Sequence, residues 1–118
     1  MSDGSMDLQS LSRQIHEMLV LGVLRTEERH GYQIALDVAE RSAGMFELQH
    51  GTLYPILHRL EERGWIKGRW DAGEGRRKKV YKLTAEGRRH LTGEIDRFEA
   101  VARGLLDVVR GRGHAGAL

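Results

Sequence analysis

Hydrophobic residues recur at helical spacing in four stretches of this chain and alternate with polar residues in two others. The helical spacing predicts helices over residues 11–24, 32–41, 51–63 and 85–110. The alternation predicts strands over residues 65–70 and 79–83, which the turn-forming residues 71–75 would join into a hairpin. The expected fold is therefore mainly α with a small β-hairpin (α+β), that is, a winged helix-turn-helix followed by a long C-terminal helix.

The third predicted helix has one apolar and one polar face. Pro55 fits best in a first turn, so we expect the helix to begin near Gly51 with Thr52 close to its cap, and Gly64 supplies a left-handed stop. In helix-turn-helix proteins the second helix of the motif enters the major groove, and its N-terminal residues reach base edges. The candidate DNA-facing residues of this helix are therefore His50, Thr52, Tyr54, His58 and Arg59, with a core position as the alternative for Tyr54.

Positive charge is concentrated on this helix and the hairpin. Residues 1–49 hold 4 Lys/Arg against 8 Asp/Glu, residues 50–90 hold 11 against 5, and residues 91–118 hold 4 against 4. A basic face on an otherwise neutral or acidic body is typical of a protein that binds a polyanion, and a solvated basic surface is the alternative. The candidate wing consists of Arg76, Arg77, Lys78 and Lys79, of which the first two lie nearest the turn and are best placed to reach DNA.

The last predicted helix carries a heptad stripe. At 1.5 Å per residue it would be about 39 Å long, which exceeds a domain of this size. We therefore expect the stripe to form a homodimer interface, with folding back onto the first helix, a combination of both, or pairing with a different protein as alternatives. The chain then divides into a disordered N-terminus (1–10), a DNA-binding domain (11–84), a dimerisation helix (85–110) and a flexible tail (111–118). The stripe consists of Leu91, Ile95, Phe98, Ala102, Leu105 and Val109.

The composition also excludes several classes of function. The chain has no cysteine, which excludes disulfides, thiolate zinc sites and a cysteine nucleophile and fits a reducing cytoplasm. Its six histidines show no metal-ligand spacing, and no phosphate-binding glycine motif precedes a helix. No apolar run is long enough to span a membrane. We therefore expect a cytoplasmic protein that is not an enzyme and has no cofactor, catalytic residue or metal.

Three segments carry a resemblance to a known protein family. They are His30-Gly31-Tyr32-x-Ile34, then Gly51-Thr52-Leu53-Tyr54-Pro55-x-Leu57-x-Arg59-Leu60-Glu61-x-x-Gly64-x-Ile66, and then Gly75-x-x-Lys78-Lys79-x-Tyr81-x-Leu83-Thr84-x-x-Gly87. Together they resemble the PadR family of transcriptional regulators over roughly residues 11–110. The length is similar to that of the short subfamily, which has a single C-terminal helix.

This resemblance implies a homodimeric repressor that binds double-stranded DNA through its winged helix-turn-helix and dimerises through its C-terminal helix. The helix that enters the major groove, here the third predicted helix, is called the reader helix. Thr52 and Tyr54 resemble the family's DNA-facing residues on this helix, and Tyr32 resembles a residue close to the DNA backbone. Members of the family often respond to small aromatic or drug-like effectors. Some short members stack planar ligands between tryptophans of the two dimer helices, whereas the last helix here has only Phe98 as a candidate ligand contact.

The expected function is thus sequence-specific repression by a homodimer on an inverted-repeat operator, with a small-molecule effector as a further candidate partner. The alternative from another class is a winged-helix protein-interaction module whose basic face docks an acidic partner protein.

Overall fold

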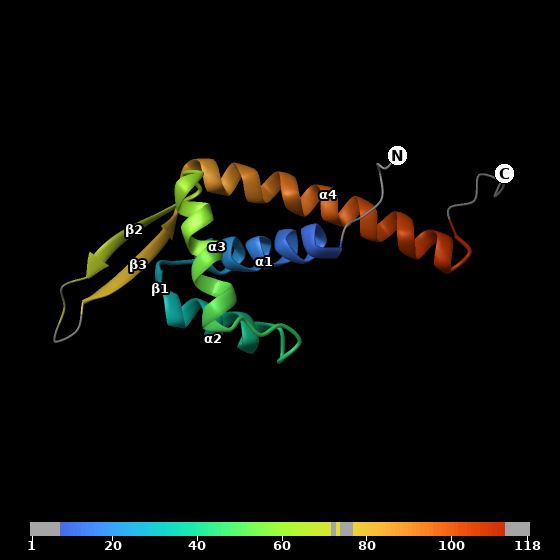
Figure 1. Cartoon of the computed structure of the whole chain (residues 1–118). Coiled ribbons are helices and arrows are strands. Elements are labelled where there is room, and N and C mark those ends of the chain that lie inside the picture. The colour runs from blue at the N-terminus through green and yellow to red at the C-terminus, as the bar shows by residue number, and fades with distance from the viewer. Residues whose placement is uncertain (1–7, 72, 74–76, 113–118) are drawn as a thin grey trace.

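The computed structural model describes residues 8–71, 73 and 77–112 of the 118-residue chain. In these residues the order of elements is α1 (Leu8–Leu24), β1 (Arg29–His30), α2 (Gly31–Arg41), α3 (His50–Glu62), β2 (Ile66–Asp71), β3 (Lys78–Leu83) and α4 (Ala85–Val109). Figure 1 shows the hairpin of β2 and β3 at one end and the long α4 lying along α1 and extending beyond it. The predicted α+β class is confirmed. None of the described helices is both long and apolar enough to cross a membrane.

The strands form one antiparallel sheet in the order β1-β3-β2. The predicted hairpin is present, with Gly68 opposite Tyr81 and Trp70 opposite Lys79. The short β1 was not predicted, because two residues are too few to show an alternating pattern. It pairs with Val80 and Tyr81 of β3 and so ties the hairpin to the start of α2. A two-stranded hairpin alone is only marginally stable, which is why this attachment matters.

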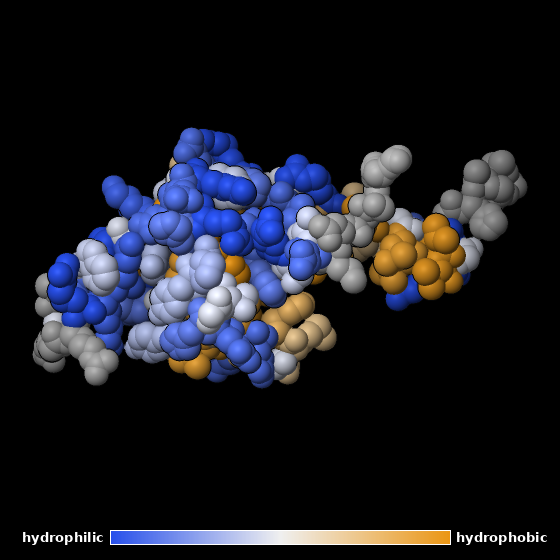
Figure 2. Space-filling view, viewed as in Figure 1, coloured by the Kyte–Doolittle hydropathy of each residue, from blue (hydrophilic) through white to orange (hydrophobic). Residues whose placement is uncertain are grey.

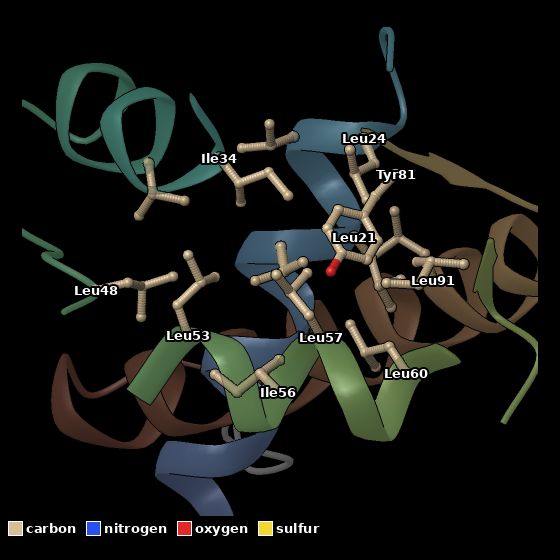
Figure 3. Close-up of a cluster of buried hydrophobic side chains, with 14 residues drawn as sticks. Leu21, Leu24, Ile34, Leu48, Leu53, Ile56, Leu57, Leu60, Tyr81 and Leu91 are labelled. Atoms are coloured by element: carbon tan, nitrogen blue, oxygen red, sulfur yellow. The ribbon is translucent and has the colours of Figure 1, made fainter. Parts of the chain in front are cut away.

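The hydrophobic core lies between α1, α2, α3 and the start of α4. Figure 3 shows side chains from all four helices, from the segment before α3 and from β3 meeting in one cluster. The apolar face predicted for the third helix supplies four of them. Because this whole face is buried, the opposite face of α3 is left for solvent or a partner. The buried residues of α3 are Leu53, Ile56, Leu57 and Leu60.

Two predicted helix starts differ from the structure. The first helix was predicted to begin at residue 11 but begins at Leu8, because Leu8 and Gln9 are themselves good helix formers. The third helix begins at His50 with Gln49 as its N-cap, which places Thr52 within the helix. Pro55 consequently lies beyond the first turn, where its missing N–H leaves the Gly51 carbonyl without a helical partner. Gly51 is exposed, so water can satisfy that carbonyl.

The junction between α3 and α4 is held by a compact set of backbone contacts. Gly64 adopts a φ of 77°, and the Trp65 amide donates to the Leu60 carbonyl at 3.0 Å, which ends α3 as predicted. The predicted cap Thr84 accepts from the amide of Gly87 at 3.0 Å and donates to the Gly64 carbonyl at 2.7 Å. A single threonine therefore joins the end of α3 to the start of α4 and fixes the direction in which α4 leaves the domain.

The heptad stripe of α4 divides into two halves. Leu91 is 2% exposed and Ile95 packs against the same core, so the monomer itself covers the first half against α1. The expectation that Leu91 faces a partner subunit is therefore wrong, because α1 lies beside this part of α4. Beyond Ile95 the stripe is open, and Leu105 is 61% exposed. Figure 2 shows the apolar surface at the C-terminal end of α4. The exposed apolar side chains there are Phe98, Val101, Leu105, Leu106, Val108 and Val109.

The predicted disorder of residues 1–10 and flexibility of residues 111–118 fall mostly outside the described residues. Within the described part, residues 8–10 belong to α1 and are not a separate N-terminal segment.

Candidate nucleic-acid interface

The exposed face of α3 presents a row of aromatic and imidazole side chains. His50, Tyr54 and His58 follow one another at intervals of four residues and are all exposed. The rings of His50 and Tyr54 stack with centroids 5.6 Å apart, and His58 Nε2 lies 3.4 Å from Glu62 Oε2. Thr52 is also exposed, but it borders the groove between α3 and α1. Four of the predicted DNA-facing residues thus lie on the surface of α3.

Tyr54 is held against the start of α2. It is 43% exposed, so it belongs neither fully to the core nor fully to the solvent. Its ring lies directly against Gly31, since a β-carbon added at Gly31 would be 3.0 Å from the tyrosine hydroxyl oxygen. At the start of α2, Tyr32 is also exposed and stacks on His30 with ring centroids 6.0 Å apart. The absence of a side chain at Gly31 therefore allows α2 and α3 to bring their two tyrosines to the same surface.

A hollow of about 500 Å³ lies between these tyrosines and the hairpin. Its walls combine aromatic rings with cations, which is the surface chemistry that suits a sugar–phosphate chain. It connects the exposed face of α3 with the base of the wing, two regions that the sequence predicted separately. The residues that line it are His30, Gly31, Tyr32, Tyr54, Trp70, Arg77, Lys78, Lys79 and Tyr81.

The predicted wing cations have different surroundings. Lys78 Nζ lies 5.3 Å from the ring centre of Tyr32, and the Arg77 guanidinium lies 4.9 Å from that of Trp70. Neither cation has a carboxylate partner among the described residues, so their charge is available to an anion. Lys79 is different, because its Nζ donates to Glu61 Oε1 at 3.1 Å and fastens the hairpin to α3. Arg76 lies outside the described residues.

Arg59 points away from the exposed face of α3. Its Nε lies 3.4 Å from Glu17 Oε2 of α1, and Glu17 is buried. The guanidinium that the sequence offered as a base-reading group is therefore engaged within the fold, where it links α3 to α1.

His30 connects the wing to α2. Gln33 Oε1 accepts from the His30 backbone amide at 2.9 Å and lies 3.1 Å from His30 Nδ1. Nε2 of the same ring is buried and has no hydrogen-bond partner among the described residues. Asp71 Oδ2 at the end of β2 lies 3.4 Å from this Nε2. The preceding Arg29 donates to Asp37 at 2.8 Å, and this bond, together with that to Glu27, raises the pKa of Arg29.

Within residues 8–71, 73 and 77–112, no group of three or more His, Asp or Glu side chains is suited to hold a metal ion.

Comparison with known proteins decides the family. The sequence profile of the "Transcriptional regulator PadR-like family" matches residues 20–93. The chain belongs to the PadR-like family. It is accordingly a member of a family of transcriptional regulators and not of enzymes.

Individual PadR-like proteins are similar over most of this chain. "Transcriptional regulator Rv3488" of Mycobacterium tuberculosis is 35% identical over 97 residues, which cover 80% of this chain and 75% of the relative. The crystal structure of a PadR family regulator from Eggerthella lenta is 30% identical with a TM-score of 0.75, and the match covers 86% of this chain and 88% of that one. The winged-helix fold with its long C-terminal helix is therefore that of the PadR-like family.

A further solved structure is that of Bacillus subtilis PadR in complex with operator DNA. It is 30% identical to this chain with a TM-score of 0.63, and the match covers 69% of this chain but only 46% of that one. This chain thus spans less than half of the B. subtilis regulator.

Four residues that line the hollow were not among the predicted site residues, namely His30, Gly31, Trp70 and Tyr81. His30, Gly31 and Tyr81 were used only as parts of the family motif, and Trp70 only as the end of a strand. Trp70 could have been found from its place opposite Lys79 and close to the cationic loop, since the alternation of a strand brings these side chains to one face of the sheet.

Proposed function

We propose that this PadR-like regulator is a sequence-specific DNA-binding repressor in which α3 enters the major groove and the hairpin is the wing. The observation that carries this proposal is the hollow that joins them. Tyr54 on the exposed face of α3 borders one side of it, and Arg77 and Lys78, which have no carboxylate partner among the described residues, border the other. A duplex whose major groove receives α3 would bring phosphates towards these cations.

In this proposal α3 and the wing have different roles in DNA binding. The helix α3 presents hydroxyl and imidazole groups, which can bond base edges, through His50 and Thr52 in its first turn and His58 farther along. The wing presents Arg77 and Lys78, whose charge serves any sequence equally well. With Arg59 engaged by Glu17, direct readout rests on few groups, and sequence-dependent DNA shape would supply part of the specificity.

The proposal includes a homodimer formed through the second half of α4. Six large apolar side chains between Phe98 and Val109 are exposed on this half of the helix, and a large exposed apolar patch marks an interaction site. A second copy related by a two-fold axis would cover the same patch on both subunits. Two reader helices would then meet an inverted repeat whose half-sites are about 10 base pairs apart from centre to centre.

Fluorescence anisotropy with labelled duplex DNA tests the DNA-binding proposal. Wild-type protein should bind random-sequence duplex at low salt and prefer an inverted repeat, which can be selected from random sequence or found upstream of its own gene. The logarithm of the association constant should fall linearly with the logarithm of salt concentration. Failure to bind any duplex at low salt, combined with retention of an acidic protein, would instead support the protein-interaction module as the function.

The proposal also includes a small-molecule effector. A small aromatic or drug-like molecule bound between the two α4 helices would find one aromatic side chain on each, Phe98, which is half exposed. If such a molecule releases the DNA, Phe98→Ala should abolish the response at a protein concentration at which sedimentation shows the variant to be dimeric. Release that persists in this variant would place the effector elsewhere.

A further inference from the structure

Trp70 is an exposed indole on the wing. It is 57% exposed near the end of β2, directly opposite Lys79 of β3. The other tryptophan of the chain, Trp65, is partly buried and stacks on His90 with ring centroids 3.6 Å apart. One tryptophan therefore belongs to the junction between α3 and α4, while the other stands at the surface.

A single exposed hydrophobic side chain needs no partner in itself. The surroundings of Trp70 are what distinguish it. The Arg77 guanidinium lies 4.9 Å and the Lys79 ammonium 5.7 Å from its ring centre. The indole also lines the hollow shared with Tyr32 and Tyr54. Trp70 thus combines a large apolar face, a position between the reader helix and the wing, and a neighbouring cation, Arg77, that has no carboxylate partner among the described residues.

We propose that Trp70 is a DNA-contact residue whose indole packs against a deoxyribose of the strand that crosses the hollow between α3 and the wing. This inference rests on the proposed function and names a residue that carries part of it. The apolar indole face matches the apolar face of a sugar, and its Nε1–H can donate to a phosphate oxygen. Arg77, held beside the ring, would neutralise the adjacent phosphate.

The contact is assigned to the sugar–phosphate chain and not to a base. Base edges face the element that lies inside the major groove, which is α3 in this proposal, whereas the region between the reader helix and the wing meets backbone. Loss of Trp70 should therefore weaken binding to all duplexes alike. It should also leave the salt dependence nearly unchanged, because no charge is removed.

The experiment compares Trp70→Ala and Trp70→Phe with wild type by anisotropy, on a selected inverted repeat and on random-sequence duplex. Trp70→Ala should bind both duplexes about tenfold more weakly, and Trp70→Phe, which keeps an aromatic face, should lose less. The matched control is Met45→Ala, which removes a similarly exposed apolar side chain outside the hollow and should bind as wild type does. Thermal melting should show all three variants folded, because each replaced side chain is largely exposed.

Intrinsic fluorescence gives a second readout without a label. Emission of the wild type should change as DNA is added and saturate at the same DNA concentration as the anisotropy. In Trp70→Phe only Trp65 remains, and the DNA-dependent change should disappear. A change that persists in Trp70→Phe would come from Trp65 and would overturn the assignment.

The outcomes separate this inference from the proposed function. If wild type binds DNA and Trp70→Ala binds equally tightly, Trp70 makes no contact while the DNA-binding function stands. A loss confined to the inverted repeat would also contradict the inference, since it would indicate a base contact. If wild type binds no duplex at all, the proposed function itself fails.

Discussion

Arg59 of α3 and Glu17 of α1 form an ion pair across the interior of the domain, with Nε of the arginine 3.4 Å from Oε2 of the glutamate. Glu17 is 8% exposed and is the one buried charged residue among those that the structure describes. The pair lies beneath the reader face, so it holds α3 at a fixed angle against α1. Its role is thus to position the helix that we propose enters the groove.

Replacing either partner should destabilise the domain, but by different amounts. Arg59→Ala leaves Glu17 buried without its cation and should cost about 2 kcal/mol of unfolding free energy. Glu17→Gln leaves an arginine that is partly exposed and can reach water, so it should cost about 1 kcal/mol. Urea denaturation measures both. The double variant should lose less than the sum of the single losses, because the two residues share one interaction. Strict additivity would show that the pair contributes nothing.

Gly87 and Gly104 lie in the same helix and should respond to alanine in opposite directions. A β-carbon at Gly87 would be 2.0 Å from the Trp65 carbonyl oxygen, which is backbone and cannot move aside. Gly87→Ala should therefore cost about 3 kcal/mol and disturb the attachment of α4. Gly104 has nothing within 4 Å of the added carbon, so Gly104→Ala should stabilise by about 0.5–1 kcal/mol through helix propensity. Equal melting temperatures for the two variants would contradict this packing.

Tyr81 should make the stability fall in alkaline solution. Burial raises its pKa above the ordinary value of about 10, and the charges of Glu61 and Tyr54 add to the rise. The unfolded chain therefore loses this proton at lower pH than the folded chain does. The contribution of Tyr81 is complete below pH about 10 and is lost as the pH rises through the folded pKa. Denaturation midpoints at a series of pH values should show a decline that is smaller in Tyr81→Phe. The exposed Tyr32→Phe serves as the control and should retain the wild-type decline.

The sequence alone predicted those features whose hydrogen-bonding groups lie close together along the chain. Gly64 ends α3 and Thr84 caps α4 as expected, since each acts on amides or carbonyls within a few residues. The spacing alone could not show which half of the heptad stripe of α4 is buried, because Leu91 and Leu105 occupy equivalent positions of the repeat. Only the position of α1 beside the first half separates the buried residue from the exposed one.

The same reason explains why the intramolecular partners of two predicted site residues could not be foreseen. Arg59 has the right spacing to share the outer face of α3, yet its partner lies 42 residues earlier in the chain. Lys79 belongs to a run of cations, but its alternation in β3 turns it to Glu61. Arrangements that depend on tertiary distance were thus missed, whereas those that depend on local chemistry were found.

A charge placed among the exposed apolar residues of α4 should separate the subunits of the proposed dimer. Leu105→Asp places a charge in the exposed apolar patch, where a partner subunit would have to bury it unpaired. Sedimentation should show a dimer for wild type and a monomer for this variant at the same concentration. Ala100→Asp adds the same charge to an exposed position on the other side of the helix and should remain dimeric. A monomeric wild type would instead favour a different protein as the partner of α4.

The wing is proposed to bind any duplex and the reader helix to recognise bases, so variants of the two elements should change DNA binding in different ways. Arg77→Ala and Lys78→Ala each remove a cation that lines the hollow and has no carboxylate partner in the described part of the chain. Each should therefore weaken binding to every duplex and reduce the salt slope by about 1. Arg103→Ala removes the same charge from an exposed position on α4, away from the hollow, and should change neither quantity appreciably. His58→Ala should leave the salt slope nearly intact and instead alter the preference among inverted repeats, because its imidazole lies on the exposed face of α3. Anisotropy titrations on several duplexes at several salt concentrations measure both effects. A wing variant that changes sequence preference without changing the slope would mean that the wing reads bases, and the roles proposed for the two elements would be reversed.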